Sequence, residues 1–260
     1  MDDMGKQFVA FMSHHLVALQ IDCEYEDEDT HNFGSEIFSG FILALYGRWY
    51  WATAGHCLRD VDQAIEEGRL RVYSCGFADF FGADAPNIQT VPFTYERGCG
   101  RYITKKELGL DFGVIPLPDL IAQNMRANKI LPIARENWVH QPSLTFSVYK
   151  MLGFPSHLIA ELGGLLPTMI HVERIDPKEV DEGPAETWFA GRISPEAKIK
   201  SIKGMSGGPI FGFRQAEDGR WYYHVVALQS WWRPDSRIVF GCSVPLVAEL
   251  LHLALSVAPA

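Results

Sequence analysis

The sequence has little positive charge and no pairing pattern among its cysteines. Lys and Arg number 23 against 32 Asp and Glu, which gives a formal net charge of −9. A surface of that sign repels phosphate backbones and anionic lipid, so we expect neither nucleic acid nor a membrane as a partner. The five cysteines are odd in number and lack a C-x-x-C pair. That spacing disfavours a disulfide framework and a zinc site, and we expect no metal and no cofactor.

Long apolar runs are also missing. No stretch approaches the roughly 18 uncharged apolar residues of a membrane span. The first residues carry acids where a signal peptide needs positive charge, and Ser13, His14 and His15 interrupt the apolar stretch that follows. Together with the unpaired cysteines, this predicts a reducing, cytoplasmic location.

Short apolar runs separated by Gly, Pro and Asp dominate the sequence, as in a β-sandwich or β-barrel. Tight hairpins are expected at Gly47-Arg48 and Asp218-Gly219. Helices are expected at residues 58–68 and 244–257. The expected strands are residues 15–23, 39–46, 49–53, 70–76, 112–116, 145–153, 169–175, 188–193, 210–213, 222–229 and 237–242.

Two further segments lack a strand pattern. The acidic run from Asp22 to Asp29 has neither the alternating Asp/Asn ligands nor the central glycine of an EF-hand. We interpret it as a solvated surface loop. Residues 117–139 are rich in proline and charge, and we expect them to link two halves of the chain.

The segment Gly204-Met205-Ser206-Gly207-Gly208-Pro209 is the sharpest chemical signal. Glycines around a serine let the backbone turn tightly and bring N–H groups close to a reacting carbonyl. A serine hydroxyl becomes a good nucleophile only when a base accepts its proton. The alternative for this segment is an ordinary Gly-Ser turn.

A base and a carboxylate are present in suitable contexts. His56 follows an aromatic run in Thr53-Ala54-Gly55-His56-Cys57, where a strand gives way to a helix. Asp111 opens the apolar run 111–117, where an acid is otherwise costly. It could fix the tautomer of an imidazole. Asp119 is a competitor that lies beyond that strand.

These three motifs, in the order His, Asp, Ser, resemble those of the trypsin-like (chymotrypsin-fold) serine peptidases, and specifically the bacterial and intracellular members without disulfides. The resemblance covers about residues 16–257 and implies an all-β fold of two six-stranded antiparallel β-barrels with a C-terminal α-helix. Residues 1–120 would form the barrel that carries His and Asp. Residues 121–260 would form the barrel that carries Ser, followed by the helix.

The resemblance implies a serine endopeptidase that acts on protein or peptide substrates through an acyl-enzyme. Its catalytic triad would be His56, Asp111 and Ser206, with the N–H groups of Gly204 and Ser206 as the oxyanion hole. Ser230, Trp231 and Trp232 would lie along the substrate backbone. Lys200 would occupy the base of the primary specificity pocket and favour an acidic side chain, or else point into solvent.

Two departures from the family bear on activity. Met205 stands where many extracellular members have an acid that pairs with a new N-terminus, so we expect no activation by trimming. Trp232 stands where the family usually has glycine, and a second indole could narrow or shut the pocket.

Other interpretations remain open. One is a catalytically inactive trypsin-like module that binds or senses a partner. A regulatory protein partner that orders the Gly204 loop is compatible with either form. Gly204-x-Ser206-x-Gly208 also fits the nucleophile elbow of α/β-hydrolases, but a strand rather than a helix is expected after it. A cysteine nucleophile at Cys57 or Cys242 lacks a partner pattern.

Overall fold

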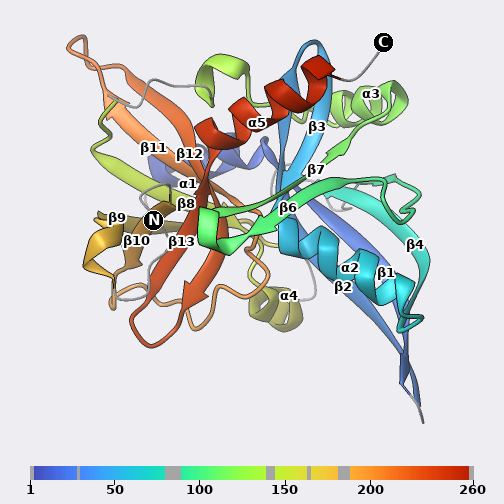
Figure 1. The fold of residues 1–260 in the computed structure, drawn as a ribbon. Coiled ribbons are helices and arrows are strands. Elements are labelled where there is room, and N and C mark those ends of the chain that lie inside the picture. Colours follow the sequence, from blue (N-terminus) through green and yellow to red (C-terminus); the bar gives the residue numbers. More distant parts are fainter. Residues whose placement is uncertain are drawn as a thin grey trace.

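The computed structural model describes residues 3–27, 30–79, 89–138, 144–162, 165–180 and 188–257. Two β-sheet units lie side by side, one from each half of the chain (Figure 1). This confirms the expected all-β class with a C-terminal helix. None of the described helices is long and apolar enough to span a membrane.

The N-terminal unit is an antiparallel sheet of seven strands in the order β5-β4-β1-β2-β3-β7-β6. It differs in detail from the expected six-stranded barrel. The two strands at its ends, β5 and β6, were absent from the sequence prediction because one is very short and the other is mostly exposed and charged. The strands are β1 (Leu16–Asp27), β2 (Thr30–Leu45), β3 (Arg48–Thr53), β4 (Leu70–Asp79), β5 (Gln89–Pro92), β6 (Arg101–Lys105) and β7 (Leu110–Pro116).

The C-terminal unit is a closed six-stranded barrel in the order β10-β13-β12-β11-β8-β9, as expected. Apolar side chains that alternate along these strands, such as Met151, Val172, Phe189 and Ala227, form its interior. The strands are β8 (Val148–Gly153), β9 (Thr168–Ile175), β10 (Trp188–Ile193), β11 (Pro209–Gln215), β12 (Trp221–Arg233) and β13 (Ile238–Ser243).

Helices and single turns connect and cover the strands. α2 (Gly55–Glu66) follows β3 and packs against β6 and β7, and α5 (Val244–Val257) continues directly from β13. The expected link between the halves contains α3 (Asp119–Ala127), so the expected domain limit at residue 120 falls in the first turn of a helix. The remaining elements are α1 (Asp3–Ser13), α4 (Ser156–Leu162) and the 3-10 turns Lys106–Leu108, Arg135–Asn137 and Pro177–Glu179.

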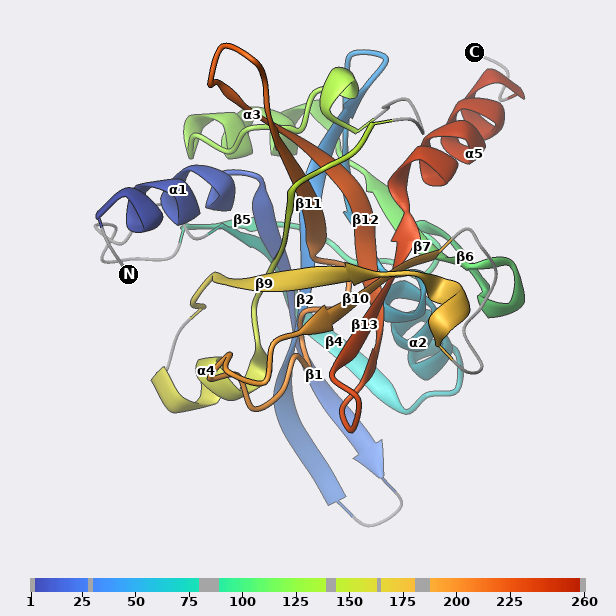
Figure 2. The same ribbon diagram turned by 90° about the vertical axis from the view of Figure 1, so that its left-hand side faces the viewer.

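Both predicted hairpins are present, the first with its turn one residue earlier than the expected Gly47-Arg48, whereas the predicted acidic loop is wrong. Tyr46 and Gly47 join β2 to β3 with positive φ angles of 52° and 75°, as a two-residue type I′ turn requires. Gly219, at φ 81°, lies in the turn between β11 and β12. Asp22 to Glu26 belong to β1 because each residue pairs with β2 across a long hairpin (Figure 2). The last two acids of the predicted loop, residues 28 and 29, lie outside the described residues.

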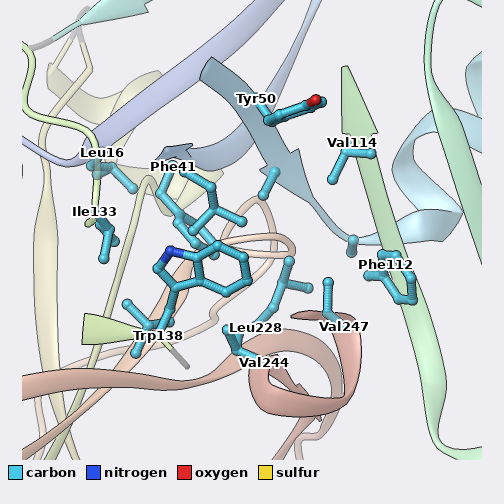
Figure 3. Packing of buried hydrophobic residues seen from close by; sticks show 14 of the residues in the cluster. Leu16, Phe41, Tyr50, Phe112, Val114, Ile133, Trp138, Leu228, Val244 and Val247 are labelled. Atoms are coloured by element: carbon cyan, nitrogen blue, oxygen red, sulfur yellow. The ribbon is translucent and has the colours of Figure 1, made fainter. Parts of the chain in front are cut away.

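The two units share one apolar core (Figure 3). Phe41 and Phe112 enter it from the N-terminal sheet, Leu228 from the barrel, and Val244 and Val247 from α5. The fully buried Trp138, from the connecting segment, lies in the same cluster. Burial of apolar area at about 25 cal/mol per Å² makes such a shared core the main force that holds the units together.

His15 is a buried polar group at the same junction. Its Nδ1 donates to the Leu131 carbonyl at 2.7 Å, and its Nε2 lies 3.0 Å from the Tyr223 hydroxyl. Burial lowers the pKa of His15 below 6.5, although the hydrogen bond to Leu131 opposes that shift. The folded protein therefore favours the neutral imidazole.

This burial predicts a pH-dependent loss of stability. Below pH 6.5 the unfolded chain gains a proton at His15 more readily than the folded protein does, so the free energy of unfolding falls as the pH falls. The variant His15→Gln should flatten that dependence by up to about 1.4 kcal/mol per pH unit. Urea unfolding between about pH 5 and pH 7 measures it, with His171→Gln, at an exposed position of β9, as the control. Equal slopes for His15→Gln and wild type would contradict the prediction.

Candidate active site

His56 and Asp111 form a close pair across the junction of α2 and β7. His56 Nδ1 lies 2.7 Å from one carboxylate oxygen of Asp111, and the His56 backbone N–H donates to the other at 2.8 Å. A carboxylate only accepts hydrogen bonds, so the proton of the neutral ring resides on Nδ1 and Nε2 is left as an acceptor. The imidazole is 29% exposed and the carboxylate 12%. The pair therefore has a fixed tautomer and one face open to a ligand.

Gly55 explains why a glycine precedes this histidine. A Cβ at this position would lie 2.6 Å from the Ile103 carbonyl oxygen and 2.8 Å from that of Phe112. Only glycine allows the first turn of α2 to approach β6 and β7 this closely. The approach brings the His56 backbone within reach of Asp111.

The pKa of His56 is raised. Burial of the ring lowers it, but the hydrogen bonds and charges of Asp111 and the neighbouring Cys57 outweigh burial and raise the pKa above 6.5. The carboxylate thus stabilises the imidazolium form, as a group that accepts a proton during a reaction requires.

The Gly204 segment is a tight turn with two N–H groups left over. The Met205 N–H donates to the Ile202 carbonyl at 3.0 Å, and Gly204 has a φ of 90°, as the second central residue of a type II turn requires. The Lys203 carbonyl accepts from the Ser156 N–H at 2.8 Å. In a trans peptide the next N–H points the opposite way, so that of Gly204 points away from α4. Among the described residues, no backbone carbonyl accepts from the N–H of Gly204 or Ser206.

Ser39 fastens this turn to the N-terminal sheet. Its buried hydroxyl donates to the Gly204 carbonyl at 2.7 Å and accepts from the Phe154 N–H at 2.9 Å. Its own carbonyl accepts from the Thr53 hydroxyl at 2.8 Å. A side chain of β2 therefore satisfies two backbone groups of the C-terminal half, at the end of the strand pair that leads to His56.

Gly207 brings the serine next to the histidine segment. A Cβ on Gly207 would lie 2.1 Å from Thr53 Oγ1 and 2.8 Å from the Ala54 nitrogen, so the backbone beside Ser206 touches the residues just before His56. Ser206 is partly exposed. Within the described part of the chain its hydroxyl forms no hydrogen bond to His56 Nε2, which is common in ligand-free sites whose hydrogen bonds tighten on binding.

A cavity of about 270 Å³ opens beside the His56–Asp111 pair. Its walls combine two indoles, Trp188 and Trp231, with Leu110 and the polar groups of Arg59 and Thr104. The Trp231 ring stacks on Phe240 with 5.2 Å between ring centroids, and Arg233 lies over it at 5.0 Å. These contacts hold the indole wall in place.

The other sequence-predicted residues differ in whether they reach this cavity. Ser230 lines it; the residue is buried, and its hydroxyl donates to the backbone carbonyl of Asp111 at 3.2 Å. Trp232 is partly buried and packs on the barrel interior together with Ile199. Lys200 is exposed and is not among the residues around the cavity. The competitor Asp119 begins α3 and does not contact His56.

Sequence reasoning missed Ser39, because a serine before an apolar run carries no signal of its distant partners. Thr53 lay inside a quoted motif, but its role became visible only with the fold. Among the described residues, no group of three or more His, Cys, Asp or Glu side chains is arranged to hold a metal ion. All five cysteines are free thiols.

Comparison with known proteins agrees with this fold. No family model and no curated protein matches the sequence. The thermostable serine protease AL20 from an extremophilic microorganism has 14% identity and a TM-score of 0.53 over 95% of this chain and 99% of that chain. A Glu endopeptidase has 14% identity and a TM-score of 0.52, over 92% and 90% of the two chains. The protease Anisep from Arthrobacter nicotinovorans has 14% identity and a TM-score of 0.53, over 94% and 96%. The chain therefore has a chymotrypsin-like fold.

The contacts of Ser39 lead to a stability prediction. Ser39→Ala should leave the Gly204 carbonyl and the Phe154 N–H without partners, at about 1–3 kcal/mol for each buried group. Urea unfolding measures the loss. The control is Ser147→Ala, because Phe213 O keeps its 2.9 Å bond from the Ser147 N–H when the hydroxyl is removed. If Ser39→Ala lowered the free energy of unfolding no more than Ser147→Ala, the hydrogen bonds of the Ser39 hydroxyl would contribute nothing to stability.

Proposed function

We propose that this protein is a serine endopeptidase that hydrolyses peptide bonds through Ser206, His56 and Asp111. The observation that carries the proposal is the His56–Asp111 pair, which is joined by two hydrogen bonds and directly follows the residues that contact the turn bearing Ser206. The chymotrypsin-like fold, shared at low sequence identity with a serine protease, a Glu endopeptidase and a further protease, supports it.

The first half of the reaction forms an acyl-enzyme. Ser206 Oγ attacks the carbonyl carbon of the substrate while its proton passes to His56 Nε2. The negative charge that develops on the carbonyl oxygen is met by the N–H groups of Gly204 and Ser206, which donate to no backbone carbonyl among the described residues. His56 then gives its proton to the leaving amine as the C–N bond breaks. Asp111 stabilises the imidazolium while it exists.

The second half releases the acid product. His56 Nε2 takes a proton from a water molecule, whose oxygen attacks the acyl carbon. The N–H groups of Gly204 and Ser206 again stabilise the oxyanion, and the proton returns to Ser206 Oγ as the ester bond breaks. No cofactor enters either half. The substrate is a protein or peptide, and we place this activity in the cytoplasm.

The inactive binding module is the second candidate. The open Ser206–His56 hydrogen bond and the second indole, Trp232, are the observations in its favour. A regulatory partner that moves the Gly204 turn would bring the Ser206 hydroxyl within hydrogen-bond distance of His56 Nε2. A probe that requires only the nucleophile and its base distinguishes the candidates without knowledge of the substrate.

Ser206→Ala should abolish covalent labelling by a fluorophosphonate probe and lower kcat by about 10⁶, because the nucleophile is lost. Intact mass spectrometry detects the adduct. Ser201→Ala is the matched control, because Ser201 lies in the same segment and its hydroxyl only accepts from the Lys203 N–H. Labelling of the Ser206→Ala variant would refute the assignment, and a wild type that never reacts would favour the binding module.

Asp111→Asn should lower kcat by about 10⁴, because an amide holds the imidazole in the wrong tautomer and cannot stabilise its charge. In the wild type, the protonated imidazole cannot accept the serine proton, and Asp111 raises the pKa of His56. Activity should therefore fall with decreasing pH from a midpoint above 6.5, and Asp111→Asn should move that midpoint to lower pH. The kcat/KM profile measures both effects. Identical midpoints would show that Asp111 does not tune His56.

A further inference from the structure

Gln229 is a buried polar residue that the reaction above does not use. It is 1% exposed, and its Oε1 is buried without a hydrogen-bond partner among the described residues. An unsatisfied buried amide oxygen costs free energy, and native structures contain few of them. A group of this kind is expected where a ligand completes the hydrogen bond.

The backbone of Gln229 is bonded to the turn that carries Ser206. Its carbonyl accepts from the Gly207 N–H at 2.7 Å, and its N–H donates to the Gly208 carbonyl at 2.9 Å. The next residue, Ser230, donates to the Asp111 carbonyl at 3.2 Å. Gln229 is therefore bonded to the residue that follows the proposed nucleophile, and it precedes the residue that is bonded to the proposed carboxylate.

The side chain of Gln229 points into the apolar end of the barrel beside that turn. Gln229 lies directly opposite Gly241, and residues opposite each other in a β-sheet face the same side. A Cβ on Gly241 would lie 2.9 Å from Ala227 Cβ and 3.1 Å from Ile210 Cδ1, both in the barrel interior. Gln229 therefore faces the barrel interior on the same side as Ala227 and Ile210.

The barrel interior that this amide faces is lined by apolar side chains. The barrel-interior cluster reaches the nucleophile turn through Ile202 and Met205 and is flanked by the partly buried Trp232. A carboxylate or an ammonium group brought there would lose its hydration without gaining an opposite charge. A neutral side chain with both a donor and an acceptor would satisfy the amide at much lower cost.

We propose that Gln229 selects the substrate side chain just before the cleaved bond and that this side chain is a carboxamide, glutamine or asparagine. The substrate NH₂ donates to Gln229 Oε1, and the substrate amide oxygen accepts from Gln229 Nε2. Trp232, which packs on the same barrel-interior cluster, would flank this substrate side chain. The inference rests on the proposed function, since it assigns the specificity of the same site.

Four peptides that differ only before the scissile bond, with Gln, Glu, Lys or Leu, test the inference on the full chain. Wild type should cleave the Gln peptide with a kcat/KM about ten- to a hundredfold above the Leu peptide. Gln229→Met, which has a similar volume and no amide, should reverse that ratio. Gln229→Glu should move the preference to Lys. The control variant is Trp138→Phe. It removes a buried N–H donor that also lacks a partner among the described residues but lies in the core shared by the two units, so the wild-type ratio should be kept.

A fluorophosphonate label on the same samples separates the two proposals. Labelled wild type and labelled Gln229→Met with the same ranking of peptides would overturn the assignment of Gln229 and leave the peptidase intact. A wild-type preference for Glu or Lys would overturn the carboxamide. Failure of the wild type to react with the probe would overturn the proposed function, and this inference with it. Gln229→Leu replaces the Met variant in every comparison if thermal unfolding shows that Gln229→Met does not fold.

Discussion

One buried hydroxyl holds together groups that the chain supplies from its two halves. Ser39, on a strand of the N-terminal sheet, bonds the Gly204 carbonyl and the Phe154 N–H of the C-terminal half. The His56–Asp111 pair belongs entirely to the N-terminal unit, whereas the Ser206 turn belongs to the other. Proton transfer between the serine and the histidine would require the two side chains to stay within hydrogen-bond distance. Apolar packing between the two units is not directional enough to hold them at that distance. The shared apolar core holds the two units together, and the hydrogen bonds of Ser39 and Thr53 fix the position of one unit relative to the other.

The parts of the site that sequence predicted are those in which local conformation and chemistry coincide. The Gly55-His56 corner needs a glycine for close approach, and the Gly204 turn needs one for its positive φ. Such requirements concern consecutive residues, so the motifs can be recognised in the sequence before the fold is known. Asp111 was predictable for a related reason, because an acid at the start of a buried strand demands a partner.

The parts that sequence could not predict depend on partners far along the chain. The acidic residues from Asp22 to Glu26 have the composition of a loop, yet they form a strand because β2 and β4 pair with them on both sides. Tertiary pairing overrides local preference in such cases. Ser39 and Gln229 are ordinary residues in apolar strands. Ser39 takes its role from Gly204 across the junction, and Gln229 takes its position from Gly207 within the C-terminal unit.

The same pattern of glycines connects turn geometry with selectivity. Gly207 lies against Thr53, so the absence of a side chain there admits a polar group from the N-terminal sheet, and the Gly207 N–H in turn donates to Gln229. Thr53 has its hydrogen bond, and its role ends with support of the turn. The side-chain oxygen of Gln229 lacks one among the described residues, although Gln229 is as deeply buried as Thr53. Two buried residues next to the Ser206 turn thus differ in whether the protein itself completes their hydrogen bonds, and we assign recognition of the substrate to the incomplete one.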